Sequence, residues 1–587
     1  MTADFVFQNG KVYTMDPANP WAQAVAVTGK TIAYVGDNTG VQEWISGDTH
    51  VIDLAGKMLM PGFVEAHNHL ATAGATKLGL ELTGARSTAD ILDRLRKYIG
   101  EHPDKKVIYG FGWEAFMFGS EWPSRHDLDA VTREIPVVLL NEDTHNAWVN
   151  SLALEMAGID HNTPDPMPGQ FYYVRDSAGN PTGICIEPPA VKPIGMAVEM
   201  WGGPEDIWKA TDALIGYHSR HGVTATHDLG MVLPGPDKNA YQGFENLCRL
   251  EKNGTLPMRF KGVVHNIEAN VTDLDVYLER TRDYVKRFNT ELVGVDAGKI
   301  WVDGVTIAKT AVMLEPYEDG SMPETDWTEE VMERWLEAFH TEGFNFHFHC
   351  EGDGSTHMAL NVIERVIKKH GPNGRRHGVH HSTAMAPSDV PRFADLGVML
   401  NTTPIWQTNW KNPKQYEDLF LPVFGKKRAD ERLFLHLQVK RAGGNVTFGA
   451  DMPGSEWYEQ GPLYMIQAAM TRKSPLLPND PGVPPIEGRI WPLHDALEAY
   501  TIAGAYQMQM EDKIGSIEVG KFADLIVIEK NLFDVDVADL HRTAILLTMM
   551  NGIVRHDAEF GVGDAAKGRA LLDGDFERLE TAKTWLN

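Results

Sequence analysis

Cysteine is scarce in this sequence: the only three in 587 residues are Cys185, Cys248 and Cys350, and none forms a Cys-x-x-Cys pair. This scarcity excludes a disulfide framework and a zinc site built from thiolates, and it fits a reducing compartment. The first residues also lack the basic patch and apolar core of a signal peptide, and no run reaches the roughly 18 apolar residues of a membrane span. We therefore predict a soluble, cytoplasmic protein with no membrane association.

Basic residues are also under-represented: the chain has 54 lysines and arginines but 81 aspartates and glutamates. A surface that binds phosphate needs clustered positive charge, so we expect no nucleic-acid partner. The composition leaves room for a multivalent cation or a neutral small-molecule substrate. The marker of a dinucleotide-binding fold, Gly-x-Gly-x-x-Gly after the first strand, is also missing.

The first 60 residues contain short runs of β-forming residues separated by turn signals at Asn9-Gly10, Gly29-Lys30 and Gly56-Lys57. Such turns between alternating β-formers are typical of hairpins. They predict a small antiparallel β unit at the N-terminus. Strand-like runs return after residue 510, in "GSIEVGKFADLIVIE" and "TAILLTMMNGIVRHD", and a helical tail, "FERLETAKTWL", follows them.

Between these ends, short apolar runs alternate with amphipathic helical stretches, each ended by glycine. This alternation is typical of a parallel α/β fold, and its length suits a (β/α)8 TIM barrel over residues 61–510. The runs that we take as barrel strands include "VIYGFGW", "PVVLLNE", "GVTATHD", "GKIWVDG", "FNFHFHC", "GVHHSTA", "GVMLNTT" and "NVTFGAD". A Pro/Gly-rich segment at about 147–202 interrupts the rhythm, and we predict that this insertion covers the active site.

Two His-x-His pairs occur, His67/His69 and His347/His349, but chance alone gives about one such pair in a chain with 23 histidines. Placement is more informative than number. Residues i and i+2 of a strand face the same way, so His67 and His69 would project together from the carboxyl end of the first barrel strand. That end of a barrel carries the chemistry in enzymes with this fold.

Later strands carry candidates at the same relative position, namely Lys299, His349, His381 and Asp451. Closure of a barrel would bring these strand ends to one mouth. Imidazole and carboxylate ligands without thiolates suit zinc or another divalent transition metal with an open position for water. The sequence therefore predicts a metal centre at the carboxyl ends of the strands.

At this point the chain resembles the amidohydrolase superfamily, and within it the YtcJ-like metal-dependent amidohydrolases (amidohydrolase family 3), which include an N-substituted formamide deformylase. The resemblance covers nearly the whole chain. It rests on nine stretches in family order: "LMPGFVEAHNHL", "EDTHNAWVNSLAL", "GNPTGICIE", "GVTATHDLG", "GKIWVDG", "HFHCEGDG", "HHSTAMAPSDVPRFADLGVMLNTTP", "FGADMP" and "IGSIEVGKFADLIVIE".

The resemblance implies roles for these residues. His67 and His69 look like the ligands of strand 1, and the ligands of strands 5 and 6 look like His349 and His381. Asp451 looks like the strand-8 aspartate that touches the metal and handles the proton. Lys299 matches a lysine that can be carboxylated to bridge two metals, so the centre would hold two ions if it is carboxylated and one if it is not.

The resemblance also implies a composite β-sandwich domain from residues 1–60 and 511–587. The chain departs from the family at two places in the site region. His380 stands where an acidic residue usually precedes the strand-6 histidine, and Glu351 occupies the third position where many members have His-Ala-Ile-Gly-Asp. These departures concern the substrate pocket more than the metal centre.

Three residues of the region allow a plainer interpretation. Lys299 could form an ordinary ion pair with an acid such as Asp303. His347 shares a face with His349, and we expect it to support the ligands from the core rather than bind metal. His380 would face away from His381 in an ideal strand and so pack structurally, unless a strand-end bulge reverses it.

Other residues are candidates for the substrate pocket. His145 and Trp148 resemble the family's His-x-x-Trp-x-Asn element, and Glu187 could orient a substrate. Aromatic residues also follow predicted strands, namely Trp113, Phe116, Trp406 and Trp410. Any one aromatic residue is more often core than pocket, but as a group they suggest a substrate with an apolar group.

These observations predict a metal-dependent hydrolase of a non-peptide C–N bond in an amide, N-substituted formamide, carbamate or cyclic imide, with Asp451 as general base and acid. One alternative is a deaminase of a small heterocycle, although such enzymes normally have Glu where this chain has Gly352. The other is a catalytically silent metal-binding protein. We expect a small-molecule substrate as the partner and a homodimer as the assembly.

Overall fold

The structure is a computed structural model that describes residues 2–562 apart from 77–78, 119–120, 143, 201–203, 231–237, 267–272, 411, 456–460 and 478. The predicted C-terminal helical tail, at 576–586, lies outside the described residues. Within the described part of the chain, every helix is too short or too polar to cross a bilayer.

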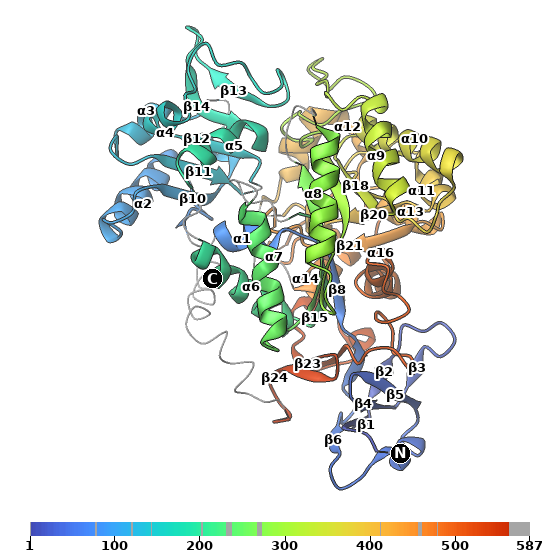
Figure 1. Cartoon of the computed structure of the whole chain (residues 1–587). Helices are drawn as coiled ribbons and strands as arrows, with labels where there is room; N and C mark the ends of the chain where they lie inside the picture. Colours follow the sequence, from blue (N-terminus) through green and yellow to red (C-terminus); the bar gives the residue numbers. More distant parts are fainter. Residues whose placement is uncertain are drawn as a thin grey trace.

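Eight parallel strands form the central sheet, which curls into a nearly closed barrel (Figure 1). The hydrogen-bonded order follows the chain, so that β8 is barrel strand 1 and β21 is barrel strand 8. The strands are β8 (Phe63–Asn68), β15 (Val223–Asp228), β16 (Arg259–Asn266), β17 (Val293–Trp301), β18 (Asn345–Cys350), β19 (Gly378–His381), β20 (Met399–Thr402) and β21 (Asn445–Phe448). The predicted α/β class and (β/α)8 barrel are confirmed.

Amphipathic helices cover the outside of this sheet. Helix α9 (Glu329–Glu342) begins at Thr328, whose hydroxyl accepts a hydrogen bond from the Val331 amide, and it ends at Gly343 with φ +91°. Its buried positions recur at helical spacing, so one face packs on the barrel. Helix α10 (Asp353–His370) follows β18 in the same way and ends at Gly371. Figure 1 shows both helices side by side on the outer surface of the barrel.

Between its last strand, β21, and its first strand, β8, the barrel is closed by individual hydrogen bonds near the ligand cluster. We call this junction the seam. The Asp451 amide donates to the His67 carbonyl at 2.8 Å, and the Ala450 amide donates to Glu65 Oε1 at 2.8 Å. Gly449 makes this approach possible, because a Cβ at that position would lie 2.6 Å from the backbone nitrogen of His67. The seam therefore places Asp451 directly beside the strand that carries the first histidines.

A second, six-stranded sheet lies beside the barrel, formed by residues between β8 and β15 (Figure 1). Its strands are β9 (Leu80–Glu81), β10 (Ile108–Trp113), β11 (Val137–Asn141), β12 (Asn146–Val149), β13 (Tyr172–Arg175) and β14 (Pro181–Ile186). The assignment of "VIYGFGW" and "PVVLLNE" to the barrel was wrong, since both belong to this side sheet. The predicted insertion at about 147–202 contains only its later part.

Both ends of the chain contribute to a β sandwich. A four-stranded sheet has the order β5-β4-β1-β6, and a six-stranded sheet has the order β24-β23-β22-β7-β2-β3. In the second sheet, β22 (Leu525–Ile528) pairs along its whole length with β7 (Met58–Pro61). Apolar side chains from both sheets share one core. The composite β sandwich is confirmed, whereas the exact domain limits stay a prediction.

Only one of the three predicted N-terminal hairpins forms. β4 (Ala24–Thr28) and β5 (Thr31–Gly36) pair antiparallel around Gly29-Lys30. Asn9-Gly10 instead connects β1 (Phe5–Gln8) to β2 (Lys11–Tyr13), which lie in different sheets, and Gly56-Lys57 likewise connects the two sheets. The unit is also not wholly antiparallel, because β1 pairs parallel with β6 (His50–Asp53). Turn residues predict a reversal of the chain but not the partner of each strand.

Candidate active site

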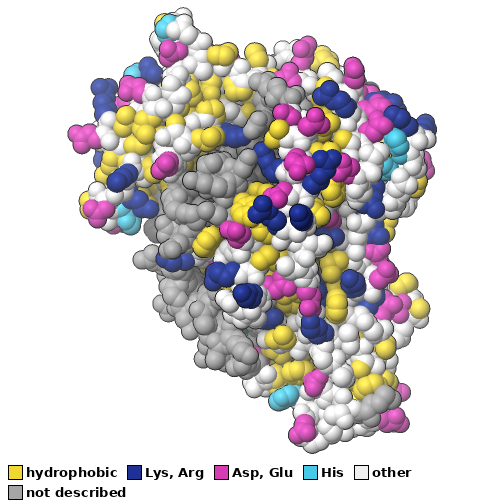
Figure 2. Space-filling model, in the orientation of Figure 1, with side chains coloured by type: hydrophobic (Ala, Val, Ile, Leu, Met, Phe, Trp, Pro, Cys, Tyr) yellow, Lys and Arg dark blue, Asp and Glu magenta, His cyan; other side chains and the backbone are white. Residues whose placement is uncertain are grey.

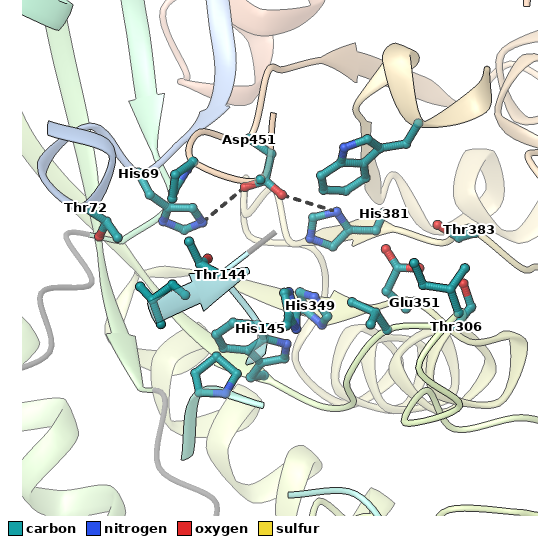
Figure 3. A pocket seen from close by; sticks show the side chains of 18 of the residues that line it. His69, Thr72, Thr144, His145, Thr306, His349, Glu351, His381, Thr383 and Asp451 are labelled. Carbon is teal, nitrogen blue, oxygen red and sulfur yellow. Dashed lines mark ion pairs between the residues drawn. The ribbon is translucent and has the colours of Figure 1, made fainter. Parts of the chain in front are cut away.

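The predicted ligands gather at the carboxyl ends of the barrel strands. Their elements are β8 for His67, the residue directly after β8 for His69, β17 for Lys299, β18 for His349, β19 for His381 and the turn after β21 for Asp451. Figure 3 shows His69, His349, His381 and Asp451 around one cavity, with Asp451 between His69 and His381. Residues separated by almost 400 positions in the sequence are thus brought into one cluster.

Asp451 lies at the centre of this cluster. Its Oδ1 atom is 3.2 Å from His67 Nε2 and 3.3 Å from His69 Nε2, and its Oδ2 atom is 3.8 Å from His381 Nδ1. One ligand atom from each of His67, His381 and Asp451 lies within 4.8 Å of the others. Such spacing would allow one ion to contact all three groups.

The donor set fits a divalent transition metal. His381 Nδ1 is buried and, within the described part of the chain, has no hydrogen-bond partner. A buried polar atom without a partner is costly, and a bound cation would remove that cost. Imidazole nitrogens and a carboxylate, with no thiolate nearby, are ligands that zinc and similar ions accept.

Neighbouring groups orient the first two histidines. His67 Nδ1 is 2.9 Å from Asn401 Oδ1, and His69 Nδ1 is 2.8 Å from the Gly230 carbonyl. Both contacts require a proton on Nδ1 and leave Nε2, the atom that faces Asp451, free to bind an ion. Asn68 points away from the centre, as the alternation of a strand predicts: its Nδ2 is 3.1 Å from a ring nitrogen of His218.

Lys299 belongs to the cluster rather than to an ion pair with Asp303. Its Nζ is 3.1 Å from His67 Nε2. Burial lowers the pKa of Lys299 to about 8, although the charges of Asp451 and Asp228 oppose this shift. The alternative pairing with Asp303 is not observed.

Asp303 instead accepts hydrogen bonds from the backbone near the end of β18. Its carboxylate accepts hydrogen bonds from four donors: the amides of Val312, Glu351 and Gly352, and the hydroxyl of Ser355. Its Oδ1 also lies 3.5 Å from Nδ1 of His349. Asp303 therefore fixes the end of β18 and lies beside the ring of the histidine at that end.

His347 and His380 lie inside the barrel, beneath the cluster. His347 Nδ1 is 2.9 Å from His380 Nε2, and the ring of His380 is 4.8 Å from that of His67. His381 has φ +72°, a left-handed conformation that breaks the alternation at the end of β19. Consecutive residues His380 and His381 can therefore both face inward, which is the reversal at the strand end that the sequence left open.

Electrostatics favour the ionised form of Asp451. Burial alone would raise the pKa of this carboxyl, but the hydrogen bond with His69 and the charges of His381, His69 and Lys299 lower the pKa to about 2. Burial also holds the pKa of His381 at about 3. At neutral pH the site thus offers an ionised Asp451 and a neutral His381, the protonation states that metal ligands need.

A cavity of about 160 Å³ opens onto the cluster. The side-sheet region contributes His145 and neighbouring residues, and the segment after β20 contributes aromatic side chains. The large apolar and aromatic lining residues are Leu140, Val191, Met200, Trp301, Trp406, Trp410, Phe420 and Phe434. The wall is therefore mainly apolar, as expected for a ligand pocket.

The predicted substrate residues divide into two groups. His145 and Trp406 line the cavity, and the ring of Trp406 stacks on His381 with centroids 5.6 Å apart. Glu187 is fully buried behind His145, pairs with its Nδ1, and accepts a hydrogen bond from the Thr310 hydroxyl at 2.7 Å. Glu187 therefore supports the pocket wall rather than forming it.

Trp113 and Trp148 belong to the other group. Both rings are fully buried in the core of the side sheet, where Trp113 donates to the Leu139 carbonyl and Trp148 donates to the Ser124 carbonyl. Their assignment to the substrate pocket is corrected, because neither ring lines the cavity. The side chain of Phe116 lies outside the described residues.

The lining residues that sequence reasoning missed include His265, Trp301 and Glu351. His265 ends the apolar run of β16, so it carried the same signal as the predicted ligands. Trp301 likewise ends β17. Glu351 was noted only as a departure from the family pattern, and burial raises the pKa of its carboxyl to about 8.

Comparisons with known proteins agree with this geometry. Residues 50–556 match the model of the amidohydrolase family. The putative amidohydrolase YtcJ of Bacillus subtilis (strain 168) is 28% identical over 571 residues, which cover 94% of this chain and 99% of that protein. The N-substituted formamide deformylase of Arthrobacter pascens is 26% identical over 562 residues, covering 94% and 98% of the two chains.

Among solved structures, an uncharacterized metal-dependent hydrolase from Pyrococcus horikoshii OT3 has the same fold. Its TM-score is 0.67 at 22% identity, with 91% of this chain and 99% of that chain covered. The similarity to this structure concerns the fold, whereas the family match extends over most of the sequence. The chain belongs to the amidohydrolase family.

Proposed function

We propose that this protein is a metal-dependent hydrolase that cleaves a non-peptide C–N bond in an amide, N-substituted formamide, carbamate or cyclic imide. The observation that carries the proposal is the convergence of His67, His381 and Asp451 on one point at the mouth of the barrel. Membership of the amidohydrolase family supports it, as does the similarity to a formamide deformylase.

The residues that would hold the ion are His67, His69, Lys299, His349, His381 and Asp451, and zinc is the ion that we expect first. When bound, a divalent ion supplies Lewis acidity that activates water and polarises a substrate carbonyl. The number of ions depends on Lys299. Burial lowers the pKa of this lysine to about 8 and so increases the neutral amine, the form that can add carbon dioxide.

Asp451 is the group that would move the proton. It is ionised at neutral pH, lines the cavity and lies within reach of both neighbouring histidines. In the proposed reaction its carboxylate accepts the proton of the attacking water and passes it to the leaving nitrogen. No side chain needs to form a covalent intermediate.

The cavity walls suggest the kind of substrate. Trp301, Trp406, Trp410, Phe420 and Phe434 surround the space beside the cluster. Aromatic walls bind apolar groups through burial of surface, so we propose a small amide with an apolar acyl group or N-substituent.

The geometry disfavours a deaminase. Deaminases on this scaffold would need a glutamate at position 352, but the Gly352 amide donates to Asp303, and a Cβ there would collide with the Val312 carbonyl. A catalytically silent metal-binding protein is disfavoured by the presence of Asp451 in the centre of the cluster.

The test uses the zinc-loaded protein and a panel of formamides, amides, carbamates, cyclic imides and amino-heterocycles, with release of amine or ammonia as the readout. We expect hydrolysis of at least one C–N class, and loss of it after chelation. D451N should retain metal by elemental analysis but lose at least about 1000-fold in kcat. The control is D319N, at a surface aspartate that pairs with Lys309.

Each other outcome contradicts a part of the proposal. Near-normal kcat in D451N would remove Asp451 from the reaction. Ammonia release from heterocycles alone would favour the deaminase, and tight metal binding without any turnover across the panel would favour the silent protein.

A further inference from the structure

A polar corner lies at one end of the cavity, whose wall is mainly apolar. Glu351, Thr306 and Thr383 lie together on the side of His381 that faces away from Asp451 and His69 (Figure 3). We call these three residues the Glu351 corner. All three are largely buried, and Glu351 is only 4% exposed.

The backbone holds Glu351 firmly in this place. Its amide donates to Asp303 Oδ1 at 2.9 Å, and its carbonyl accepts a hydrogen bond from the Ala384 amide at 3.0 Å. The Thr383 side chain interacts with the Glu351 carboxyl and opposes the rise in pKa that burial causes. The carboxyl is therefore presented to the cavity by a rigid strand end, which is the kind of support that specific recognition needs.

The carboxyl of Glu351 has acceptor capacity that the protein does not use. Within the described part of the chain, no lysine or arginine forms an ion pair with it, and the ionisable groups that act on it are Asp303, His145 and Asp451. A carboxylate offers about four lone-pair positions, of which a single hydroxyl such as that of Thr383 can occupy at most one.

Other polar lining residues lie at the ligand cluster, on the opposite side of His381, or along the rest of the wall, among them Lys192, His265 and Gln415. A substrate that lies across the cavity, with its reacting bond at the cluster, would therefore place another of its groups against the corner. If that group could not donate a hydrogen bond, the buried carboxyl would lose access to water without a replacement partner.

We propose that Glu351, with Thr306 and Thr383, binds an N–H or O–H group of the substrate, so that the enzyme prefers amides that carry an amino or hydroxyl group beside their apolar part. This inference rests on the proposed function, because it concerns the substrate of the same site. A buried carboxyl left without a donor typically costs a factor of about 10 to 100 in binding.

The test compares substrates of equal shape. One series varies the acyl side and consists of the benzylamides of propionic acid, glycolic acid and glycine. The other varies the amine side and consists of formamides of para-ethyl-, para-(hydroxymethyl)- and para-(aminomethyl)benzylamine. In at least one series, kcat/KM of the zinc-loaded wild type should be about 10- to 100-fold higher for a donor-bearing member than for the alkyl member.

Variants of Glu351 then test whether this residue causes the preference for donor-bearing substrates. E351L should reduce the ratio of donor-bearing to alkyl kcat/KM to about one, whereas the same-shaped E351Q should keep part of the preference for hydroxyl and lose the preference for amino. The control T72V changes a threonine on the opposite side of the cavity, beyond His69, and should preserve the wild-type ratio (Figure 3). Elemental analysis and thermal unfolding check that each variant is folded and loaded.

Binding of the corresponding free amines and acids, measured by calorimetry on the zinc-loaded protein, separates the two proposals. If no amide is hydrolysed but binding of a donor-bearing compound falls at least 10-fold in E351Q or E351L, the corner stands and the proposed function fails. If amides are hydrolysed with no donor preference in either series, or with a preference that E351Q and E351L both retain, the inference about Glu351 is overturned.

Discussion

Replacement of Asp303 by asparagine tests how the end of β18 is held. Asp303 is fully buried and accepts hydrogen bonds through Oδ2 from the amides of Val312 and Gly352 and from the Ser355 hydroxyl, and through Oδ1 from the Glu351 amide. Asparagine has one acceptor oxygen and one NH2 group. Either orientation of its amide therefore turns a donor toward at least one buried backbone N–H.

The magnitude follows from the less damaging orientation. If the NH2 group takes the position of Oδ1, only the Glu351 amide loses its acceptor, and one unsatisfied buried donor costs about 1–3 kcal/mol. The same exchange removes the acceptor that lies 3.5 Å from His349 Nδ1. Loss of such an outer partner typically weakens metal affinity by about 10- to 100-fold.

Two measurements check these expectations for D303N. Chemical denaturation of the metal-free protein should show a loss of about 1–3 kcal/mol, and competition with a fluorescent chelator should show the weaker zinc affinity. D319N is the matched control, since its aspartate has a side chain 46% exposed and an exposed ion pair of this kind contributes little to stability. The reasoning would be refuted by a D303N protein with wild-type stability and wild-type zinc affinity.

Further variants test the lysine, the seam and the pH dependence. K299M should lower the zinc content of the purified protein. If two ions are bound, peptide mass spectrometry of the wild type should find one added carbon dioxide on Lys299. Equal zinc content in K299M and the wild type would exclude Lys299 as a ligand. G449A should weaken zinc binding at least about 10-fold, because the new methyl group meets the backbone of His67, whereas G100A, which has open space around it, should not. Burial lowers the pKa of His377 to about 3, so below about pH 6.5 the unfolded chain takes up a proton that the folded chain does not. The free energy of unfolding therefore falls on acidification, and His377 contributes up to about 1.4 kcal/mol per pH unit to this fall. H377N in the metal-free protein should therefore show a flatter dependence of unfolding free energy on pH between about 6.5 and 5, and an unchanged slope would contradict the buried neutral histidine.

The ligand cluster was predictable because a polar residue at the end of an apolar run marks the end of a parallel strand. His67, His349 and His381 were located in this way, and the barrel then supplied their convergence. His265 carried the same mark at the end of β16, so closer attention to that run would have found it. The conformation of His381, on which the direction of His380 depends, has no signature in the local sequence.

Other errors came from contacts between distant segments. The apolar runs Ile108–Trp113 and Val137–Asn141 have the composition of buried parallel strands, which is the same whether they pair within the barrel or beside it. Trp113 and Trp148 follow apolar runs, as pocket residues do. The side sheet that buries them, however, combines segments that come before and after each tryptophan in the chain. Local pattern thus predicts the kind of element, whereas the neighbouring elements decide what a side chain contacts.

The shared sheet of the two chain ends also constrains the order of events during protein synthesis. β7 continues through Gly62 into β8, the strand that carries His67, and β7 pairs with β22 near the end of the chain. A ribosome releases β7 early and β22 late, so the base of the histidine-bearing strand stays without this partner until nearly the whole polypeptide has emerged. We therefore expect unfinished chains to need protection of this exposed strand edge, and chains that stop before Leu525 to be unable to hold the metal centre in place.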